Sequence, residues 1–435
     1  MKAVEAPWIR PAAVVHDPAT RIDELLADFA LALSERGFRI AGFIQLNNRN
    51  GAQVLGEGCA DRVEVLDLRS RKTLTLERTT EASNPAVAVA AATTLRMAMH
   101  ESADLLVISR FAAFESMVNR PMTAVEDGIS RGLPVLTSIS GRCCEKWYRF
   151  SGYGGAMLTP DRAALWQWWG PERLYRDLAL GVADAPVKRI VCGPRWLMVE
   201  GPFGVGLSSL PKGPGPLLPR LPALEQMTLK ALAGFTASWD ALEMAVGIAA
   251  INAHYNRFDL DVAFGNGTQA FRGTDGRVMV IGAFPGLSEV LPAAQVIEAQ
   301  PRPGELPTIA MDTVLPGCAA AVISASSIVN RTLPRILRLT GGARNALIGP
   351  ATPMTPRLHT YGIEVLGGLR VRNPEGLAAA VAAGGRPADF DRFGDYVHIR
   401  EPAPSPARSL ATLRDVAVSA SSCMGRGEAR ECCAC

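Results

Sequence analysis

Aromatic residues and excess charge are both scarce in this chain of 435 residues. Phe, Trp and Tyr together make up 6%, so small aliphatic side chains, mainly alanine and valine, must do much of the core packing. The 45 basic and 42 acidic residues leave a formal net charge of +3. This near balance argues against a dedicated nucleic-acid binder, which usually carries a basic patch. Apolar residues reach 48%, which excludes global disorder.

Long apolar segments are also missing. Residues 1–18 contain no sustained apolar stretch of the kind that a signal peptide needs. The longest uncharged stretch, Thr313 to Asn330, is interrupted by Pro316-Gly317 and by small polar residues. It therefore predicts a turn that leads into a buried strand rather than a membrane span. We expect a soluble, cytoplasmic protein without a membrane span.

Several motifs of known catalytic sites do not occur. No G-x-x-x-x-G-K-[ST] sequence is present, so we expect no working nucleotide P-loop. H-E-x-x-H and G-x-S-x-G are missing too, and the five histidines lie far apart along the chain. Gly282 and Gly286 lack the G-x-G-x-x-G spacing of a dinucleotide fingerprint, and the near-match that begins Gly204-Val-Gly206 has Ser209 where the third glycine belongs. No catalytic residue follows from these patterns.

The nine cysteines are unevenly spaced, and four of them crowd the C-terminal end. This arrangement is not the disulfide framework of a small secreted domain. Thiolates select soft transition metals, so the terminal group is a candidate metal site, with one C-x-x-C pair inside it. The simpler alternative is a tail of exposed thiols. The candidate metal ligands are Cys423, Cys432, Cys433 and Cys435. For the adjacent pair Cys143-Cys144, a packing role is favoured.

The alternation of strand and helix patterns predicts an α/β protein with parallel sheets. A first α/β domain spans residues 10–170 and ends with a Trp-rich helix. An α+β part follows at residues 171–272. Residues 273–402 alternate most regularly and predict a Rossmann-like parallel sheet. Residues 403–435 are a flexible, Cys-rich tail behind a Pro/Ser linker.

A long helix rich in small residues is predicted in the α+β part, from Ser238 as its N-cap to Tyr255. Gly247, Ala249, Ala250 and Ala253 on this helix would let another backbone approach closely.

Polar residues follow four of the predicted parallel strands. They lie at 282–286, at Glu298, at 324–327 and at 349–353. Each alone is explained by a turn or a helix cap. Because parallel strands end at one edge of their sheet, and ligands bind there, the recurrence predicts a binding site for an anion or another polar ligand.

Residues 187–400 resemble a prokaryotic family named as a heavy-metal chelation domain. The resemblance is carried by SWDALEMAVGIAAINAHYNR, VMVIGAFPGL, VIEAQPRPGELP, SIVNRTLPRIL, LIGPATPMTPRL and GIEVLGGLRV. It implies an enolase-N-terminal-like α+β part and a Rossmann-like part, with a ligand cleft between them. A turn of the G-H-F-P type in the family has Ala283 here in place of histidine. Carried onto matching positions, the cleft-lining residues are Glu200, Asn252, Gly282, Phe284, Glu298, Asn330, Thr332, Gly349, Pro350 and Thr352.

Residues 12–160 resemble a second, uncharacterised bacterial family that is associated with molybdenum transport and is distantly similar to P-loop nucleoside-triphosphatases. The matching stretches are LLADFALALSERGFRIAGFIQ, VLDLRSRKTLTL, ADLLVISRFAAFES and GLPVLTSIS. The family's fourth strand ends in an Asn-Arg/Lys-Phe-Gly-Lys-type motif, whereas this chain has Ser109-Arg110-Phe111-Ala112-Ala113. Together with the missing Gly-Lys-Ser loop after Val15, this predicts a degenerate NTPase-like domain.

The leading hypothesis is binding of a transition metal, a metal oxyanion such as molybdate, or a small metal chelate, in molybdenum or heavy-metal handling. Glu200 and Glu298 would supply carboxylates. An enzyme with a nucleotide-like cofactor in the Rossmann-like part is the alternative, and a scaffold that presents the Cys-rich tail is a third. The expected partner is a small ligand or metal, not a nucleic acid; a second copy of the chain or a metal-handling protein is left open.

Overall fold

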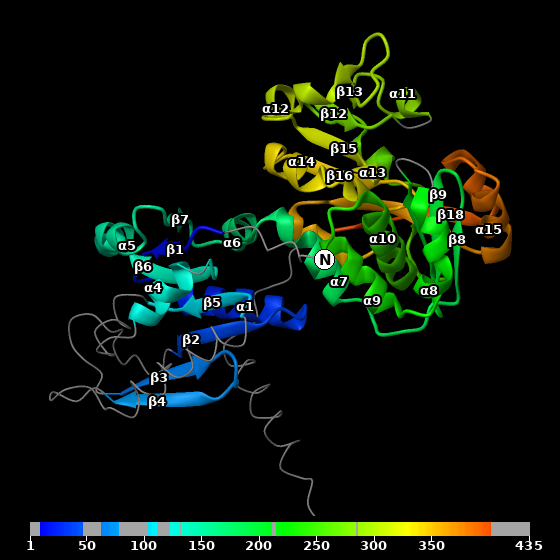
Figure 1. Ribbon diagram of the computed structural model, residues 1–435. Helices are drawn as coiled ribbons and strands as arrows, with labels where there is room; N and C mark the ends of the chain where they lie inside the picture. The colour runs from blue at the N-terminus through cyan, green and yellow to red at the C-terminus, as the bar shows by residue number, and fades with distance from the viewer. Residues whose placement is uncertain are drawn as a thin grey trace, which may run out of the picture. The chain divides into compact units, whose positions relative to one another are not determined.

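The computed structural model describes residues 9–46, 62–77, 103–110, 122–130, 132–210, 215–283 and 286–401. The chain divides into two compact units between Trp169 and Gly170. Both units are built around sheets of mostly parallel strands, so the predicted α/β class is confirmed (Figure 1). Phe284 and the tail at 403–435 lie outside the described residues.

The N-terminal unit contains a seven-stranded sheet in the order β4-β3-β2-β5-β6-β1-β7. Neighbours among β2, β5, β6, β1 and β7 run parallel, and β3 and β4 add an antiparallel hairpin beside β2. Buried parallel strands are continuous apolar runs, which explains why ADLLVIS and GLPVLTSIS are recognisable in the sequence. The strands are β1 (Ala12–His16), β2 (Ile40–Leu46), β3 (Arg62–Asp67), β4 (Thr73–Glu77), β5 (Leu105–Ile108), β6 (Val135–Ser140) and β7 (Ala156–Leu158).

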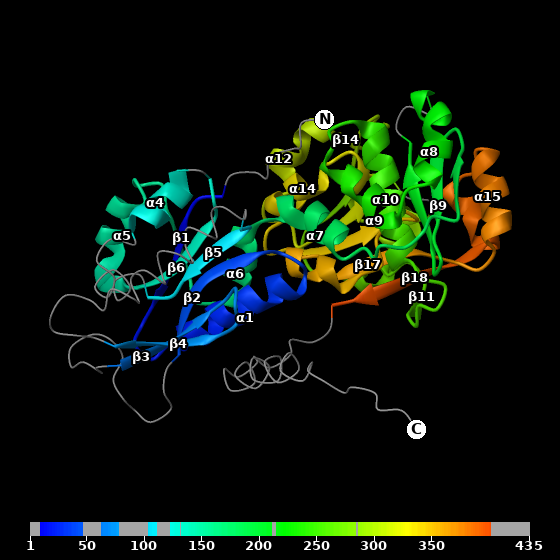
Figure 2. The ribbon, with the colours of Figure 1, turned by 60° about the horizontal axis from the view of Figure 1, so that its bottom comes forward.

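Helices cover both faces of this sheet. Figure 2 shows α1 (Ile22–Glu35) and α6 (Arg162–Trp169) on one face, with α4 (Met122–Ser130) and α5 (Cys144–Phe150) on the other. Trp166 and Trp169 of α6 are buried, and Trp166 meets the ring of Phe29 on α1 edge-on at 5.3 Å. Such aromatic pairs add roughly 0.5–1.5 kcal/mol beyond area burial. The Trp-rich segment is thus a docked helix.

The C-terminal unit is organised by an eight-stranded sheet in the order β11-β18-β17-β16-β15-β12-β13-β14. The six strands from β14 to β17 are parallel, and β18 and β11 form an antiparallel edge. Their bounds are β11 (Ala263–Phe264), β12 (Val278–Ile281), β13 (Gln295–Glu298), β14 (Leu306–Pro307), β15 (Ala320–Ser324), β16 (Arg344–Ile348), β17 (Val365–Val371) and β18 (Gly394–Arg400).

Within this sheet the first strand of the series, β12, lies beside the fourth, β15. The chain proceeds from β12 toward one side and from β15 toward the other, which is the order of a doubly wound dinucleotide-binding sheet. Such a reversal leaves a gap outside the carboxyl ends of the two central strands. The connecting helices are α11 (Leu287–Val290), α12 (Met311–Val314), α13 (Ser326–Val329), α14 (Leu333–Leu339) and α15 (Pro374–Ala382).

The α+β part is a three-stranded antiparallel sheet, β8 (Arg189–Cys192), β9 (Trp196–Glu200) and β10 (Val205–Ser209), with several helices. The helices are α7 (Leu174–Leu180), α8 (Leu221–Glu225), α9 (Leu229–Ala233) and α10 (Ala241–Tyr255). Ser238 was the expected N-cap of α10, but Asp240 occupies that position. Its Oδ1 accepts the N–H groups of Leu242 and Glu243, both at 2.9 Å. A carboxylate at the N-cap also interacts favourably with the helix dipole, whereas Ser238 lies two residues too early.

The three-stranded sheet of the α+β part packs closely onto α10 and onto the Rossmann-like part. A Cβ at Gly206 of β10 would lie 1.9 Å from the carbonyl oxygen of Ala249, so only glycine allows this strand to contact α10. Gly247 likewise leaves room for the backbone of Thr236, as the small residues of this helix predict. Trp196, Met198 and Leu207 share one apolar core with Ala325 and Ala351, which follow β15 and β16.

No described helix combines the length and the apolarity that a bilayer crossing requires.

We expect Gly206→Ala to lower the unfolding temperature of the C-terminal unit, because the added methyl group overlaps the α10 backbone. Overpacking of this kind costs about 1–3 kcal/mol, or more when backbone must move. Gly234→Ala is the matched control: a Cβ there meets nothing within 4 Å, and the change should lie within about 0.5 kcal/mol. Scanning calorimetry of the full chain measures both. Equal unfolding temperatures for the two variants would contradict the close approach.

Candidate functional site

Glycine brings the ends of the two central strands together. Gly282 follows β12 with φ +88°, and a Cβ at this position would lie 2.6 Å from Cβ of Ser324 at the end of β15. Any other residue would therefore clash with Ser324 and strain the backbone. The loops after β12 and β15 meet at the reversal point of the sheet, as the sequence pattern predicts.

Glu298 joins a third strand to this edge. As the last residue of β13, it accepts the N–H of Ala283 through Oε1 at 3.4 Å and that of Ala299 through Oε2 at 3.0 Å. Its side chain is partly exposed. The carboxylate is thereby held beside the loop after β12, and each oxygen keeps a lone pair that can accept a further bond.

Hydroxyl groups continue the edge beyond β15. Ser326 donates from Oγ to Oγ of Ser324 at 3.0 Å. Ser327 is 3% exposed, and its Oγ has no hydrogen-bond partner among the described residues. A buried hydroxyl without a partner is unusual, because leaving one unpaired is costly, so this oxygen is an available polar contact.

The loop after β16 is buried and lies against the loop after β15. Gly349 has φ +140°, and a Cβ there would lie 3.1 Å from Cβ of Ala325. Pro350 and Thr352 are buried, with Thr352 fully inaccessible. Three of the four predicted strand-end loops thus meet around Ser324 and Ala325, and Glu298 is attached to them through Ala283.

Two asparagines of the α10 region hold this loop. Asn252 Nδ2 donates to the carbonyl oxygens of Leu207 at 2.8 Å and Ala351 at 2.9 Å. Asn256 Nδ2 donates to Thr352 O at 3.0 Å, and its Oδ1 accepts the N–H of Met354 at 2.9 Å. Asn252 is completely buried, so its amide group positions the loop rather than facing solvent.

Asn330 and Thr332 form an Asx turn, which their own hydrogen bonds stabilise. Asn330 Oδ1 accepts both the N–H of Thr332 at 3.0 Å and its hydroxyl at 2.6 Å. Between them, Arg331 has the left-handed φ of +63°. Asx turns of this kind favour that conformation for the residue they enclose, although it is rare for arginine.

The Arg331 side chain anchors this turn to the α+β part. Its guanidinium lies between the rings of Tyr175 and Trp239, 4.9 and 4.6 Å from their centroids, and donates to the carbonyl oxygens of Thr236 and Ser238. Burial raises the pKa of Tyr175, so its phenol stays neutral and donates to Ile328 O at 2.9 Å. The sequence did not single out this stacked group, because its members come from three distant segments.

Glu200, the second predicted carboxylate, lies in a different environment. It pairs across the β8–β9 ladder with Arg189, whose Nε is 2.9 Å from Glu200 Oε2, and with Lys188 at 3.7 Å. Arg189 also pairs with Glu375 at 2.7 Å. Glu375 and Glu200 raise the pKa of the Arg189 guanidinium. The described contacts of Glu200 are thus those of an ion-pair network.

The described residues contain no group of three or more His, Cys, Asp or Glu side chains that could hold a metal ion. Cys143 and Cys144 pack beside Ala13, Ile139 and Trp147, so their predicted packing role is confirmed. Burial raises the pKa of the Cys192 and Cys318 thiols, which disfavours the metal-binding thiolate. The cysteines proposed as metal ligands lie outside the described part of the chain.

The N-terminal unit has an internal ion pair close to the start of α1. Asp23, in the first turn of this helix, is 1% exposed, and its Oδ2 lies 2.8 Å from Nη2 of Arg110 just after β5. The backbone N–H of Arg110 donates to Ser138 Oγ at 2.9 Å. A helix N-terminus in this position is where P-loop proteins hold phosphate. Here the first turn carries a carboxylate of the chain itself, which pairs with Arg110. The absence of a working P-loop stays a prediction.

Asn252→Ala should destabilise the C-terminal unit, because it removes the donors for two buried carbonyl oxygens. Each of the two unpaired carbonyl groups costs about 1–3 kcal/mol, so the expected loss in unfolding free energy is about 2–6 kcal/mol. Calorimetric unfolding of the full chain measures it, with Gln269→Ala, an exposed amide, as control. An unchanged unfolding temperature would show that Asn252 does not hold the loop.

Comparison with known proteins separates the same two units. Residues 175–255 and 269–400 match two family profiles that are both described as "Putative heavy-metal chelation". Residues 11–168 match a family described as a protein of unknown function. That part is also similar to the molybdenum import ATP-binding protein ModC 2 of Bradyrhizobium diazoefficiens, at 30% identity over 166 residues. The match covers 37% of this chain but only 18% of that relative's length.

Three solved structures are similar to parts of the chain. A protein of unknown function from Pyrococcus horikoshii is 22% identical over 52% of this chain and 98% of its own, with a TM-score of 0.46. A human cancer-related nucleoside triphosphatase is 18% identical over 34% of this chain and 88% of its own, with a TM-score of 0.26. A protein of unknown function from Desulfitobacterium hafniense is 31% identical over 52% of this chain and 97% of its own, with a TM-score of 0.47. This last protein and the P. horikoshii protein are both members of the family matched by residues 269–400.

By its identity to nearly the whole of the D. hafniense protein and by its two profile matches, the chain belongs, through its C-terminal unit, to the heavy-metal chelation family.

Proposed function

We propose that the C-terminal unit binds a transition metal as a small chelate at the carboxyl edge of the Rossmann-like sheet, in molybdenum or heavy-metal handling. The observation that carries this proposal is the meeting of Gly282, Ser324 and Glu298 at the point where the strand order reverses. Doubly wound sheets bind their ligands at this point. Membership in a family named for metal chelation supports the choice of ligand.

The donor groups favour a metal that arrives with its own ligands. Zinc sites use three or four protein ligands, and the described residues offer no group of three or more His, Cys, Asp or Glu side chains. At this edge, Glu298 supplies one carboxylate, while Ser324 and Ser326 supply hydroxyl groups. A chelate needs only hydrogen bonds and one opposite charge from the protein, and these groups can provide both.

Charge at the edge distinguishes a chelate from an oxyanion. Glu298 carries negative charge, which repels molybdate and attracts a chelate of positive charge. Asn330, Thr332 and the Gly349–Thr352 loop would shape the site around it. The proposed molybdenum role is supported by the N-terminal similarity to a molybdenum import ATP-binding protein.

Isothermal titration calorimetry on the full-length chain tests this proposal, with Cys423, Cys432, Cys433 and Cys435 changed to serine so that tail thiols do not contribute. The titrants are Ni²⁺ complexed by a tetradentate amine, Ni²⁺ complexed by nitrilotriacetate, free Zn²⁺ and molybdate. We expect the cationic amine complex to bind most tightly. Glu298→Gln should weaken binding of the amine complex about tenfold, because it removes one charged interaction worth about 1.4 kcal/mol.

The matched control is Glu289→Gln, because Glu289 is an exposed carboxylate on α11 and is not one of the proposed ligand-binding groups. If molybdate bound and the amine complex did not, the oxyanion would replace the chelate as the ligand. If none of the four titrants bound, or if both glutamate variants lost binding equally, the proposed site would be wrong.

A nucleotide-like cofactor is the second candidate, and the strand order of the sheet favours it. The turn after β12, however, lacks the glycine spacing that holds a pyrophosphate. We expect no increase in unfolding temperature with NAD⁺ or ATP. A stabilisation of several degrees that Gly282→Ala abolished would establish the cofactor instead. The tail cysteines remain a proposed soft-metal site, which anaerobic metal analysis of the wild-type and serine-substituted chains would test.

A further inference from the structure

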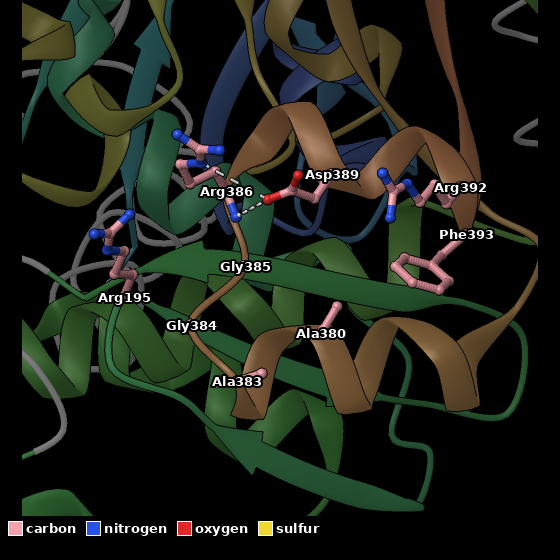
Figure 3. A pocket seen from close by; sticks show the side chains of 9 residues that line it. All are labelled: Arg195, Ala380, Ala383, Gly384, Gly385, Arg386, Asp389, Arg392 and Phe393. Carbon is pink, nitrogen blue, oxygen red and sulfur yellow. Dashed lines mark hydrogen bonds and ion pairs between the residues drawn. The ribbon is translucent and has the colours of Figure 1, made fainter.

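A pocket of about 510 Å³ lies at the end of α15, and none of its lining residues belongs to the carboxyl edge described above. It is formed by the turn between β8 and β9, the end of α15 and the short helix η8 (Pro387–Arg392) (Figure 3). Its volume is in the range of small-molecule sites. The lining residues are Arg195, Ala380, Ala383, Gly384, Gly385, Arg386, Asp389, Arg392 and Phe393.

Glycine and proline fix the position of the β8–β9 turn against α15. A Cβ at Gly193 would lie 1.8 Å from the carbonyl oxygen of Val381, so this turn touches the helix backbone directly. Pro194 lies against Gly384, because a Cβ added at Gly384 would be 3.4 Å from Cγ of Pro194. Arg195 follows immediately and is therefore held beside the Gly384–Arg386 segment.

The arginines are not needed to cap α15. Gly385 donates its N–H to Ala380 O at 2.8 Å, and Gly384, with φ +79°, donates to Val381 O at 3.0 Å. These two bonds are the Schellman arrangement, which satisfies carbonyl groups at a helix end by backbone alone. The guanidinium groups around the helix end thus keep their hydrogen-bonding capacity.

Positive charge exceeds negative charge by two in this pocket. Three arginines and one aspartate line it. The guanidinium groups of Arg195 and Arg392 form no hydrogen bond or ion pair with any described residue. Arg386 is only loosely paired, with Nε 3.8 Å from Asp389 Oδ2, because the same oxygen accepts the backbone N–H of Arg386 at 2.9 Å.

Beside Arg392, one wall of the pocket is apolar. The Phe393 ring packs against α15, where a Cβ at Gly376 would lie 2.5 Å from its Cδ1. Figure 3 shows the Phe393 ring and Ala380 on the same side of Asp389 as Arg392, with Arg195 and Arg386 on the other side. A ligand that fills the pocket meets guanidinium groups on one part of its surface and an aromatic ring on another.

We propose that this pocket binds a small organic phosphate, with the phosphoryl group held by Arg392 and attracted by the positive charge of Arg195, and with an aromatic or aliphatic group placed against Phe393. Guanidinium groups bind phosphate through paired, charge-assisted hydrogen bonds. The excess of two positive charges matches a phosphate monoester, which carries nearly two negative charges at neutral pH. A nucleotide and a sugar phosphate share this chemistry, and the class is defined by the phosphoryl group.

Titration calorimetry of the full-length chain with phenyl phosphate, inorganic phosphate and phenol tests this site. We expect phenyl phosphate to bind more tightly than inorganic phosphate, because only the ester reaches Phe393, and phenol not to bind measurably. Arg392→Ala should weaken phenyl phosphate binding by about five- to tenfold, as expected for one charge-assisted contact at a partly exposed site. Arg195→Ala should weaken it less, because Arg195 acts through its charge without a direct contact.

Arg302→Ala is the matched control, since Arg302 is exposed and lies outside the pocket. All three arginine variants should keep the wild-type unfolding temperature, because the cap of α15 is made by backbone groups. Glu298→Gln should leave phenyl phosphate binding unchanged, which separates this site from the proposed metal site. Unchanged binding in both pocket variants, equal weakening by Arg302→Ala, or no binding of phenyl phosphate at millimolar concentration would overturn the proposal.

Discussion

Two buried carbonyl oxygens share one donor at the centre of the C-terminal unit. Asn252 Nδ2 donates to Leu207 on β10 and to Ala351 after β16, so a single amide group ties the antiparallel sheet to the loop of the parallel sheet. The bond is possible only because Gly206 lets β10 lie directly on α10. The loop in turn places Gly349 against Ala325, and Ala325 follows Ser324. The position of the carboxyl edge thus depends on an interaction several residues away from it.

The strand pattern, the α/β class and the edge at which polar loops meet were all predictable from the sequence. Buried parallel strands are short apolar runs with turns at their ends, and the reversal point follows from parallel pairing. Gly282 and Glu298 could be placed at this edge because each ends its strand. Serine is common at N-caps, so the sequence predicts Ser238 at the start of α10. In the structure, Ser238 instead ends the 3₁₀ segment Gly234–Ala237, and Asp240 is the N-cap.

What could not be predicted depends on contacts between distant segments. Arg331 lies between Tyr175 and Trp239, which are far from it in the chain, and its left-handed backbone has no signature beyond the adjacent asparagine. Glu200 enters the candidate site through the family resemblance, whereas its pairing with Arg189 follows from the register of β8 and β9. The arginine pocket joins residue 195 to residues 386 and 392, and no spacing rule relates them.

The hydrogen bonds at the end of α15 affect how the surface charge around this helix can vary during evolution. Its last carbonyl groups are satisfied by the amides of Gly384 and Gly385, so helix stability and surface charge are uncoupled at this position. Where side chains cap a helix, replacing them costs stability, and their identity is constrained by folding. Around α15, in contrast, arginines can be exchanged for other residues at little cost to the fold. Relatives with the same backbone can therefore differ in the charge of this surface, and selection on ligand preference can act there independently of selection on stability.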